Sequence, residues 1–320
     1  MTYNNKIDFH THYITPGFNK YLDDNYNGHG DGVKTPAWDI DSHRKMMQDM
    51  DIKKSMLAIS SPHVGAASTD AEAVQLADEV NAYAAKIVAQ YPDEFGLMAT
   101  LPLPNGKNSA AAVAQIRRDY NPVGYTLPTN SRGVYIGDPS LDDMMTALND
   151  DHALISIHPN EPAKQDINAA KSVKTPLMEF FFDTTRTLVN MSEARIFSRF
   201  PNITWIIPHA GALLPIIAER VDIGGKFLAE GDQEPADTLL DVMPHLYYDM
   251  AGMVLPYQLP TLMQIVPADH FLYGSDYPYT PQPVIEQLAN MLDTTDVLTD
   301  TQKKQMFETN GVALLASTKH

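Results

Sequence analysis

Short strand-like runs of apolar residues alternate with longer helix-like runs along almost the whole chain. Several of the short runs, such as Ile203-Thr204-Trp205-Ile206-Ile207, are nearly continuously apolar, as expected for strands buried on both faces. This alternation predicts βα units around a parallel sheet. The predicted strands are eight, at residues 7–13, 54–61, 95–103, 123–128, 153–158, 203–209, 246–251 and 270–276. Eight such strands favour closure into an α/β fold of the (β/α)8 TIM-barrel type.

The segments between these strands predict the helices and loops of the same barrel. Thr69-Asp70-Ala71-Glu72 resembles a helix N-terminus, in which acidic residues after the capping threonine suit the helix dipole. The predicted helices cover residues 41–50, 70–91, 109–119, 141–150, 177–199, 213–228, 256–266, 283–292 and 301–315. Two long connections, 15–38 and 160–175, leave the carboxyl ends of strands, so we expect long loops over the C-terminal face of the barrel.

Length and composition narrow both the architecture and the chemistry. The 320 residues suit one barrel with insertions, and no linker or repeat divides them, so we expect a single domain over residues 1–320. No run of about 18 apolar residues is present and the start of the chain lacks a signal-peptide pattern, so we expect a soluble, cytoplasmic protein. Because there is no cysteine, any metal must be held by histidine and carboxylate side chains.

The charge of the chain excludes some partners. The formal net charge is −17, with 40 acidic and 23 basic residues, and the resulting field repels phosphate backbones and anionic membranes. We therefore expect neither nucleic acid nor a membrane as a partner. The same field repels a small anionic substrate, so a site for one needs concentrated positive charge, which a divalent cation supplies.

The first predicted strand ends in two histidines separated by one residue, in Asp8-Phe9-His10-Thr11-His12. Side chains alternate across a strand, so His10 and His12 point to the same side, with Cα atoms about 6.5 Å apart. Two imidazoles at that spacing can converge on one metal ion with bonds of about 2.0–2.1 Å. Histidine pairs also occur on solvated strand faces, so this motif alone leaves both interpretations open.

Three later strands also end in groups that can bind a metal or move a proton. His158, His209 and Asp276 fall at or near the ends of the predicted strands 153–158, 203–209 and 270–276. Closure of the barrel brings these strand ends around one mouth, together with His10 and His12. A single histidine in such a place is most simply a core or surface residue, but five groups at one structural level favour a shared site.

Two further residues have weaker claims on this site. His63 follows the strand 54–61, and Arg186 lies in Phe182-Asp183-Thr184-Thr185-Arg186. Either side chain is a weak candidate for binding substrate. For Arg186 a surface or structural ion pair is the simpler interpretation.

From Asp8 to about Ala313 the chain resembles the metal-dependent amidohydrolase superfamily, in particular its decarboxylase-containing amidohydrolase-2 branch. Within this branch it is similar to the aminocarboxymuconate-semialdehyde decarboxylases and, more closely, to the 6-methylsalicylate decarboxylases. The motifs that carry the resemblance are Asp8-Phe9-His10-Thr11-His12, Ile157-His158-Pro159, Pro208-His209-Ala210-Gly211, Tyr247-Tyr248-Asp249 and Gly274-Ser275-Asp276-Tyr277-Pro278.

The resemblance implies an amidohydrolase-like barrel with one divalent metal. His10, His12, His158 and Asp276 would be its ligands, with His209 nearby as an acid or base. Members with two metals usually bridge them through a modified lysine at the end of the fourth strand, which here ends at residues 127–129 without a lysine. The aminocarboxymuconate-semialdehyde enzymes bind substrate with arginines in the loop before Trp38. No arginine lies between His12 and Trp38, which argues against that substrate.

Two reaction classes remain open for such a site. The first is non-oxidative decarboxylation of a small aromatic or muconate-type acid, most simply a salicylate-like ortho-hydroxy acid, with Asp276 as proton donor and His209 as orienting or relaying group. The alternative is hydrolysis of a lactone or amide, or a hydration, through a metal-bound water. Zinc suits the imidazole ligands best and manganese is the alternative. Family likeness also implies a homo-oligomer, a dimer or larger.

Overall fold

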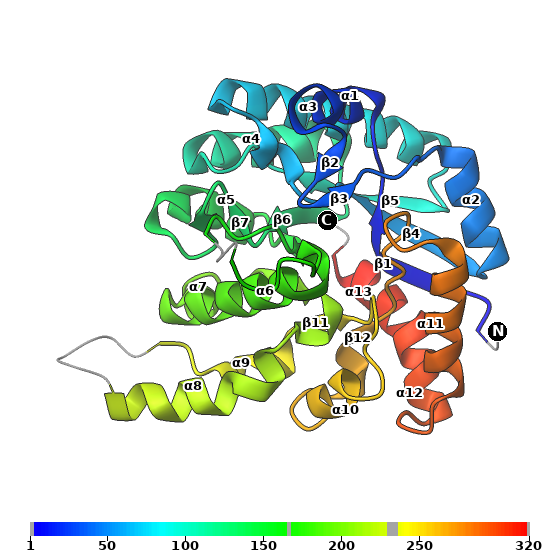
Figure 1. Ribbon diagram of the computed structural model, residues 1–320, viewed down its shortest axis with the longest axis vertical. Helices are drawn as coiled ribbons and strands as arrows, with labels where there is room; N and C mark the ends of the chain where they lie inside the picture. The colour runs from blue at the N-terminus through cyan, green and yellow to red at the C-terminus, as the bar shows by residue number, and fades with distance from the viewer. Residues whose placement is uncertain (1–2, 165–167, 229–235, 319–320) are drawn as a thin grey trace.

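The computed structural model describes residues 3–164, 168–228 and 236–318, and within them an eight-stranded parallel sheet curls into a barrel (Figure 1). Its strand order follows the chain, as in a (β/α)8 barrel. Isolated bridges from Asp8 to Tyr273 and from Thr11 to Tyr277 join the first strand to the last. The strands are β1 (Lys6–His12), β4 (Ile52–Ala58), β5 (Phe95–Thr100), β6 (Gly124–Pro128), β9 (Leu154–His158), β10 (Thr204–Ile207), β11 (Tyr247–Asp249) and β12 (Phe271–Leu272).

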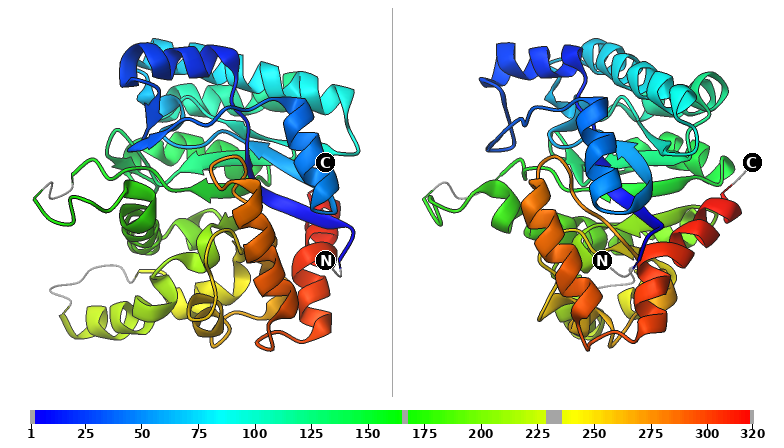
Figure 2. Two further views of the ribbon diagram at one scale, coloured as in Figure 1. Left: turned by 45° about the vertical axis from the view of Figure 1, so that its right-hand side comes forward. Right: turned by 90° about the vertical axis from the view of Figure 1, so that its right-hand side faces the viewer.

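Helices cover the outside of the barrel on all sides (Figures 1 and 2). Seven of them follow successive strands, and α11 and the C-terminal helices follow β12. They are α2 (Ile40–Asp49), α3 (Asp70–Gln90), α4 (Gly106–Tyr120), α5 (Asp142–Asp150), α6 (Thr175–Glu193), α8 (Leu214–Leu228), α10 (Gln258–Leu262), α11 (Gln282–Thr294), α12 (Asp300–Lys304) and α13 (Asn310–Ser317). The predicted fold class is thereby confirmed.

Alternating side chains explain why the strands are apolar on both faces. On β9 and β10, Ile155 and Ile207 belong to the large cluster that packs the helices against the sheet, whereas Leu154 and Ile206 belong to a smaller cluster. The smaller cluster gathers one or two residues from each of six strands and fills the space inside the barrel.

The connection 15–38, predicted as a loop, contains helix α1 (Pro16–Tyr26) and a small hairpin, β2 (His29–Gly30) and β3 (Val33–Lys34). The side chain of Thr15 caps α1 by accepting from the backbone N–H of Phe18, and Phe18 and Leu22 are buried. Asn27 ends the helix in the left-handed conformation. The expectation that this segment leaves the C-terminal end of β1 still holds, but most of it is ordered secondary structure.

Two predicted helices are interrupted in the structure. The segment 177–199 divides into α6 and α7 (Ile196–Arg199) because Arg195 adopts a left-handed conformation. The segment 301–315 contains a π-helical turn, Gln305–Thr309, between α12 and α13. Of the second long connection, 160–175, residues 165–167 lie outside the described part of the chain. No helix in the described ranges combines the length and apolarity needed to cross a membrane.

Candidate active site

The histidines at the strand ends meet at the C-terminal mouth of the barrel. His10 and His12 end β1, His158 ends β9, and one ligand atom from each lies within 4.8 Å of the other two. All three side chains are buried. Their rings lie 4.7 to 5.4 Å apart between centroids and are strongly inclined to one another, so their edges rather than their faces converge.

Asp276 completes this cluster from the segment after β12. Its Oδ1 lies 3.2 Å from Nε2 of His12 and 3.7 Å from Nε2 of His10. Burial would raise the pKa of Asp276, but the hydrogen bond with His12 and the charge of His10 outweigh burial and lower the pKa to about 2. The carboxylate is therefore ionised at neutral pH, as a metal ligand must be.

A buried carboxylate, Asp249, orients His10 from behind. Oδ2 of Asp249 accepts from Nδ1 of His10 at 2.9 Å, which leaves Nε2 of His10 directed toward His12 and Asp276. Burial works to lower the pKa of His10, but the Asp249 charge outweighs it and the pKa is raised to about 9. A histidine whose second nitrogen donates to a carboxylate is the usual arrangement around metal ligands.

The residues around this cluster fit a divalent cation. Within the described part of the chain, the buried Nε2 of His10 and Nδ1 of His158 have no hydrogen-bond partner, and both ring nitrogens of His12 lack one of normal geometry. Leaving several imidazole nitrogens buried and unpaired is unfavourable unless a ligand satisfies them. Three imidazoles and one carboxylate form a donor set that suits zinc or manganese.

His209 lies beside the cluster in a strained turn after β10. Its ring centroid is 5.0 Å from that of His10, and its backbone N–H donates to Oδ1 of Asp249. His209 and the two following residues all have positive φ, an uncommon conformation for residues other than glycine. Gln258 fixes the turn by donating to the carbonyl of His209 at 2.7 Å. Burial lowers the pKa of His209 to about 4, so its imidazole is neutral at physiological pH.

Aromatic side chains from the start of α6 border the histidines. Phe181 stacks on His209 with 5.8 Å between ring centroids and 22° between planes, and Phe180 lies 6.1 Å from His158. Tyr279, from the segment after β12, meets His12 edge-on at 5.6 Å. These rings give the surroundings of the cluster an aromatic character suited to a flat apolar ligand.

The two weaker candidates have different surroundings. The ring of His63 lies 5.4 Å from that of His158, within the site, and burial lowers its pKa to about 3. Arg186 donates to Asp183 at 2.9 Å and its side chain is half exposed. Asp183 is fully buried and also accepts from Tyr135 and Asn130, so Arg186 is bound into a structural network.

Asp249 is the functional residue that reasoning from the sequence did not assign. In the sequence it appears as the last residue of Tyr247-Tyr248-Asp249, at the end of the seventh strand. A carboxylate at that place is expected at the barrel mouth for the same reason as Asp276. The signal was therefore present in the rule that strand ends meet at one mouth.

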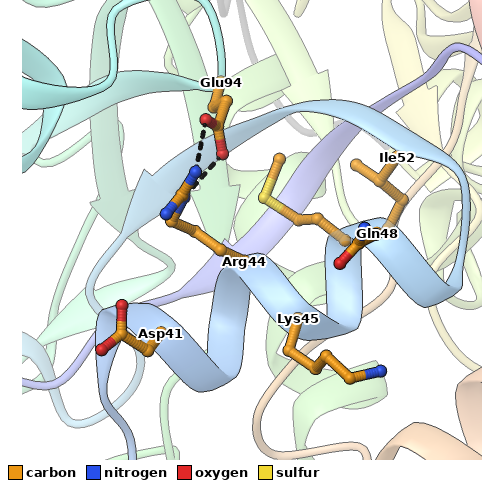
Figure 3. Close-up of a pocket in the computed structure, with 7 residues that line it drawn as sticks. Asp41, Arg44, Lys45, Gln48, Ile52 and Glu94 are labelled. Atoms are coloured by element: carbon orange, nitrogen blue, oxygen red, sulfur yellow. Dashed lines mark hydrogen bonds and ion pairs between the residues drawn. The ribbon is translucent and has the colours of Figure 1, made fainter.

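One surface hollow lies away from the histidines. A depression of about 480 Å³ lies against the outer side of α2, where Arg44 forms a two-pronged ion pair with Glu94 (Figure 3). Ile52 begins β4 and Glu94 precedes β5, so this depression lies at the opposite end of the strands from the histidines. The histidine cluster, and not this depression, therefore holds the candidate metal ligands.

Proteins described as decarboxylases match this chain over most of their own length. Decarboxylase macB of Penicillium terrestre is 27% identical over 301 residues, which cover 90% of this chain and 88% of that protein. The 6-methylsalicylic acid decarboxylase of Penicillium expansum is 25% identical over 305 residues, 93% of each chain.

Solved structures give the same picture. One described as an amidohydrolase II matches with a TM-score of 0.92 and 41% identity, covering 98% of this chain and 100% of the other. A dihydroxybenzoic acid decarboxylase from Polaromonas, solved with manganese and the inhibitor 2-nitroresorcinol, has a TM-score of 0.86 over 99% of this chain and 98% of its own. Its 19% identity shows likeness of fold alone.

A sequence model of the family described as amidohydrolase matches residues 7–316, which include every residue of the site. The predicted resemblance and the prediction of an enzyme are confirmed. The chain belongs to the amidohydrolase family and, like its decarboxylase relatives, is an enzyme.

Proposed function

We propose that the protein is a carboxy-lyase that removes CO₂ from a small aromatic acid, specifically a salicylate-like ortho-hydroxy acid. The observation that carries this proposal is the cluster of His10, His12, His158 and Asp276 at a barrel mouth bordered by phenylalanines. The relative that acts on 6-methylsalicylic acid supports the same substrate class. Neither nucleic acid nor a membrane enters the proposal.

The proposed cofactor is one divalent ion held by Nε2 of His10, by His12, by His158 and by Asp276. When bound, the ion supplies the positive charge that holds the carboxylate and ortho hydroxyl of the substrate. Three imidazoles favour zinc, and the carboxylate ligand admits manganese, the metal in the Polaromonas structure.

Asp276 is the proposed proton donor to the ring. Because its carboxylate is ionised at neutral pH, it must first take a proton, which the ortho hydroxyl of the substrate can give. Asp276 then passes this proton to the ring carbon that bears the carboxylate. The bond between that carbon and the carboxylate breaks, its electron pair returns to the ring, and CO₂ leaves. The phenoxide left behind takes a proton from water.

His209 is the proposed orienting and relaying group. Its backbone is fixed by Asp249 and Gln258, and its ring is held against Phe181, so the imidazole keeps one position near Asp276. A neutral imidazole can accept the hydroxyl proton and return it. The same property supports the second candidate, hydrolysis or hydration, in which His209 takes a proton from water.

We also propose that the enzyme is a homo-oligomer and that a second copy covers the outer face of α8. Ile216, Ile223 and Phe227 lie along one side of this helix and are 65%, 48% and 82% exposed. The helix lies at the rim of the molecule (Figures 1 and 2), and a row of large apolar side chains in such a place is typical of a protein interface. A symmetric pair would bury this row against itself.

The first prediction separates the two reaction classes. Protein loaded with zinc or manganese should release CO₂ from salicylate or a ring-substituted salicylate, measured by headspace gas analysis. Protein stripped of metal by a chelator is the control and should release none. Turnover of a panel of lactones without CO₂ release from any ortho-hydroxy acid would favour hydrolysis instead.

The second prediction separates metal binding from proton transfer. His12→Ala should lose bound metal because a ligand is removed, whereas His209→Ala should keep about one metal per chain and lose turnover by about 10²–10⁴-fold. Elemental analysis of protein purified without added metal measures the first effect, and steady-state rates measure the second. Full activity of His209→Ala would remove His209 from the reaction.

The third prediction concerns Asp249. One of its oxygens accepts a hydrogen bond from His10, and the other accepts from the backbone N–H groups of His209 and Ala251. In Asp249→Asn the amide NH₂ group replaces one of these acceptors and cannot accept the hydrogen bond. Metal affinity should fall by about 10–100-fold, measured by competition with a chelating dye.

Asp183→Asn is the matched control for this change, because Asp183 is likewise a buried carboxylate whose two oxygens both accept hydrogen bonds, each from two donors. It should destabilise the fold without a comparable loss of metal affinity. Equal metal affinities of the two variants would show that the hydrogen bond from His10 to Asp249 does not strengthen metal binding.

The fourth prediction tests the oligomer. Ile223→Glu should shift the wild-type assembly toward a monomer, because a carboxylate buried in an apolar interface is unfavourable. Light scattering coupled to size exclusion measures the mass, and Val284→Glu, which places the same carboxylate at an exposed apolar position of α11, is the control. A monomeric wild-type protein would contradict the proposal.

A further inference from the structure

His63 is a buried histidine whose ring nitrogens have no hydrogen-bond partner among the described residues. Its residue is 1% exposed, and both Nδ1 and Nε2 are unpartnered. It begins the 3-10 helix His63–Ala66 after β4, with a φ of 53°, an uncommon value for a residue other than glycine. Burying an imidazole in this way is unfavourable unless some partner satisfies it.

A second buried histidine shows what an ordinary structural histidine looks like in this chain. His43, on α2, is also fully buried, but its Nδ1 accepts from Nε1 of Trp38 at 3.1 Å. Its ring packs edge-on against Phe95 and Tyr277. The ring of His63 has no comparable hydrogen bond to any residue of the described ranges, so its imidazole is free to bond to a ligand.

The surroundings of His63 place it in the wall of the metal cluster. Its ring is 5.4 Å from that of His158, which in turn is 4.7 Å from that of His12. Ser60, three residues earlier, lies with its Oγ 3.5 Å from Nε2 of His158. The segment after β4 is thus folded toward the proposed ligands.

Helix α1 packs against the 3-10 helix His63–Ala66. The hydroxyl groups of Tyr21 and Tyr26 both donate to the backbone carbonyl of Ala66, at 3.3 and 2.5 Å. This contact ties α1 to the helix that carries His63 and keeps bulk water away from it. A ligand seated beside His158 is therefore the available partner for the His63 imidazole.

We propose that His63 binds the substrate, donating a ring N–H to the carboxylate of the aromatic acid; this inference rests on the proposed function. An imidazole carries at least one N–H in either protonation state, so it can always donate. A carboxylate is the acceptor for which such a bond is strongest. Because Arg186 is engaged by Asp183, it does not compete for this role.

The test uses two ligands that differ in the carboxylate. Salicylate has a carboxylate beside a hydroxyl, whereas catechol has two neighbouring hydroxyls and no carboxylate. Binding of each to metal-loaded protein is measured by isothermal titration calorimetry in the His209→Ala background, which should keep its metal and leave salicylate unconsumed. His63→Phe and His63→Leu should weaken salicylate binding by about 10–100-fold and change catechol binding by less than about threefold.

Two further variants control for packing. His63→Gln keeps a donor and should recover part of the salicylate affinity. His43→Phe replaces the matched structural histidine and should leave the ratio of salicylate to catechol affinity unchanged. Metal content is checked in every variant, and two donor-free substitutions at position 63 guard against one of them failing to fold.

The possible outcomes point to different conclusions. Unchanged salicylate binding in the donor-free variants, or equal loss of both ligands, would overturn the role of His63 and leave the proposed function standing. If the metal-loaded protein with His63 intact binds neither ligand, the proposed function itself fails. Selective loss of salicylate affinity, partly restored by His63→Gln, supports the inference.

Discussion

Two buried carboxylates hold the ends of the strands in the arrangement on which the site depends. Asp249 accepts from Nδ1 of His10 and from the backbone N–H groups of His209 and Ala251, which joins the ends of β1, β10 and β11. Asp8 accepts at 3.1 Å from the backbone N–H groups of His10 and Ser275, which joins β1 to the segment after β12. The same two carboxylates therefore close the barrel and orient the proposed ligands. Loss of either carboxylate leaves backbone donors unpaired at the base of the site.

The eight strands were predictable because each is a short apolar run whose position needs only local sequence. Helix α1 was not predicted, although Thr15 and Pro16 form a standard helix start. The Gly-, Asn- and Asp-rich residues around it resemble a loop, and Phe18 and Leu22 are the only residues of the helix that are fully buried. A helix with so small an apolar face depends on the barrel that it covers, and local composition cannot reveal that support.

The candidate site also has features that the sequence predicted and features that it could not predict. The strand-end rule brought His10, His12, His158 and Asp276 together, because parallel strands in a barrel present their ends at one mouth. It could not show that Asp249, 239 residues from His10, meets that histidine, since the pairing depends on the side-chain direction at the end of a three-residue strand. The strained turn at His209 was equally hidden, because nothing local marks a histidine for a positive φ.

The charges of the site explain why decarboxylation suits it. Burial keeps His158, His209 and His63 neutral, whereas Asp249 raises the pKa of His10 to about 9, and the carboxylates of Asp249 and Asp276 both have lowered pKa values. A divalent cation bound beside a neutral His10 would balance the charges of Asp249 and Asp276, so the complex of this site with the carboxylate of an acid would carry one net negative charge in a buried place. Departure of that carboxylate as neutral CO₂, with uptake of a proton, removes that charge. Hydrolysis of a neutral lactone relieves no such charge, and it would create an acid in the site.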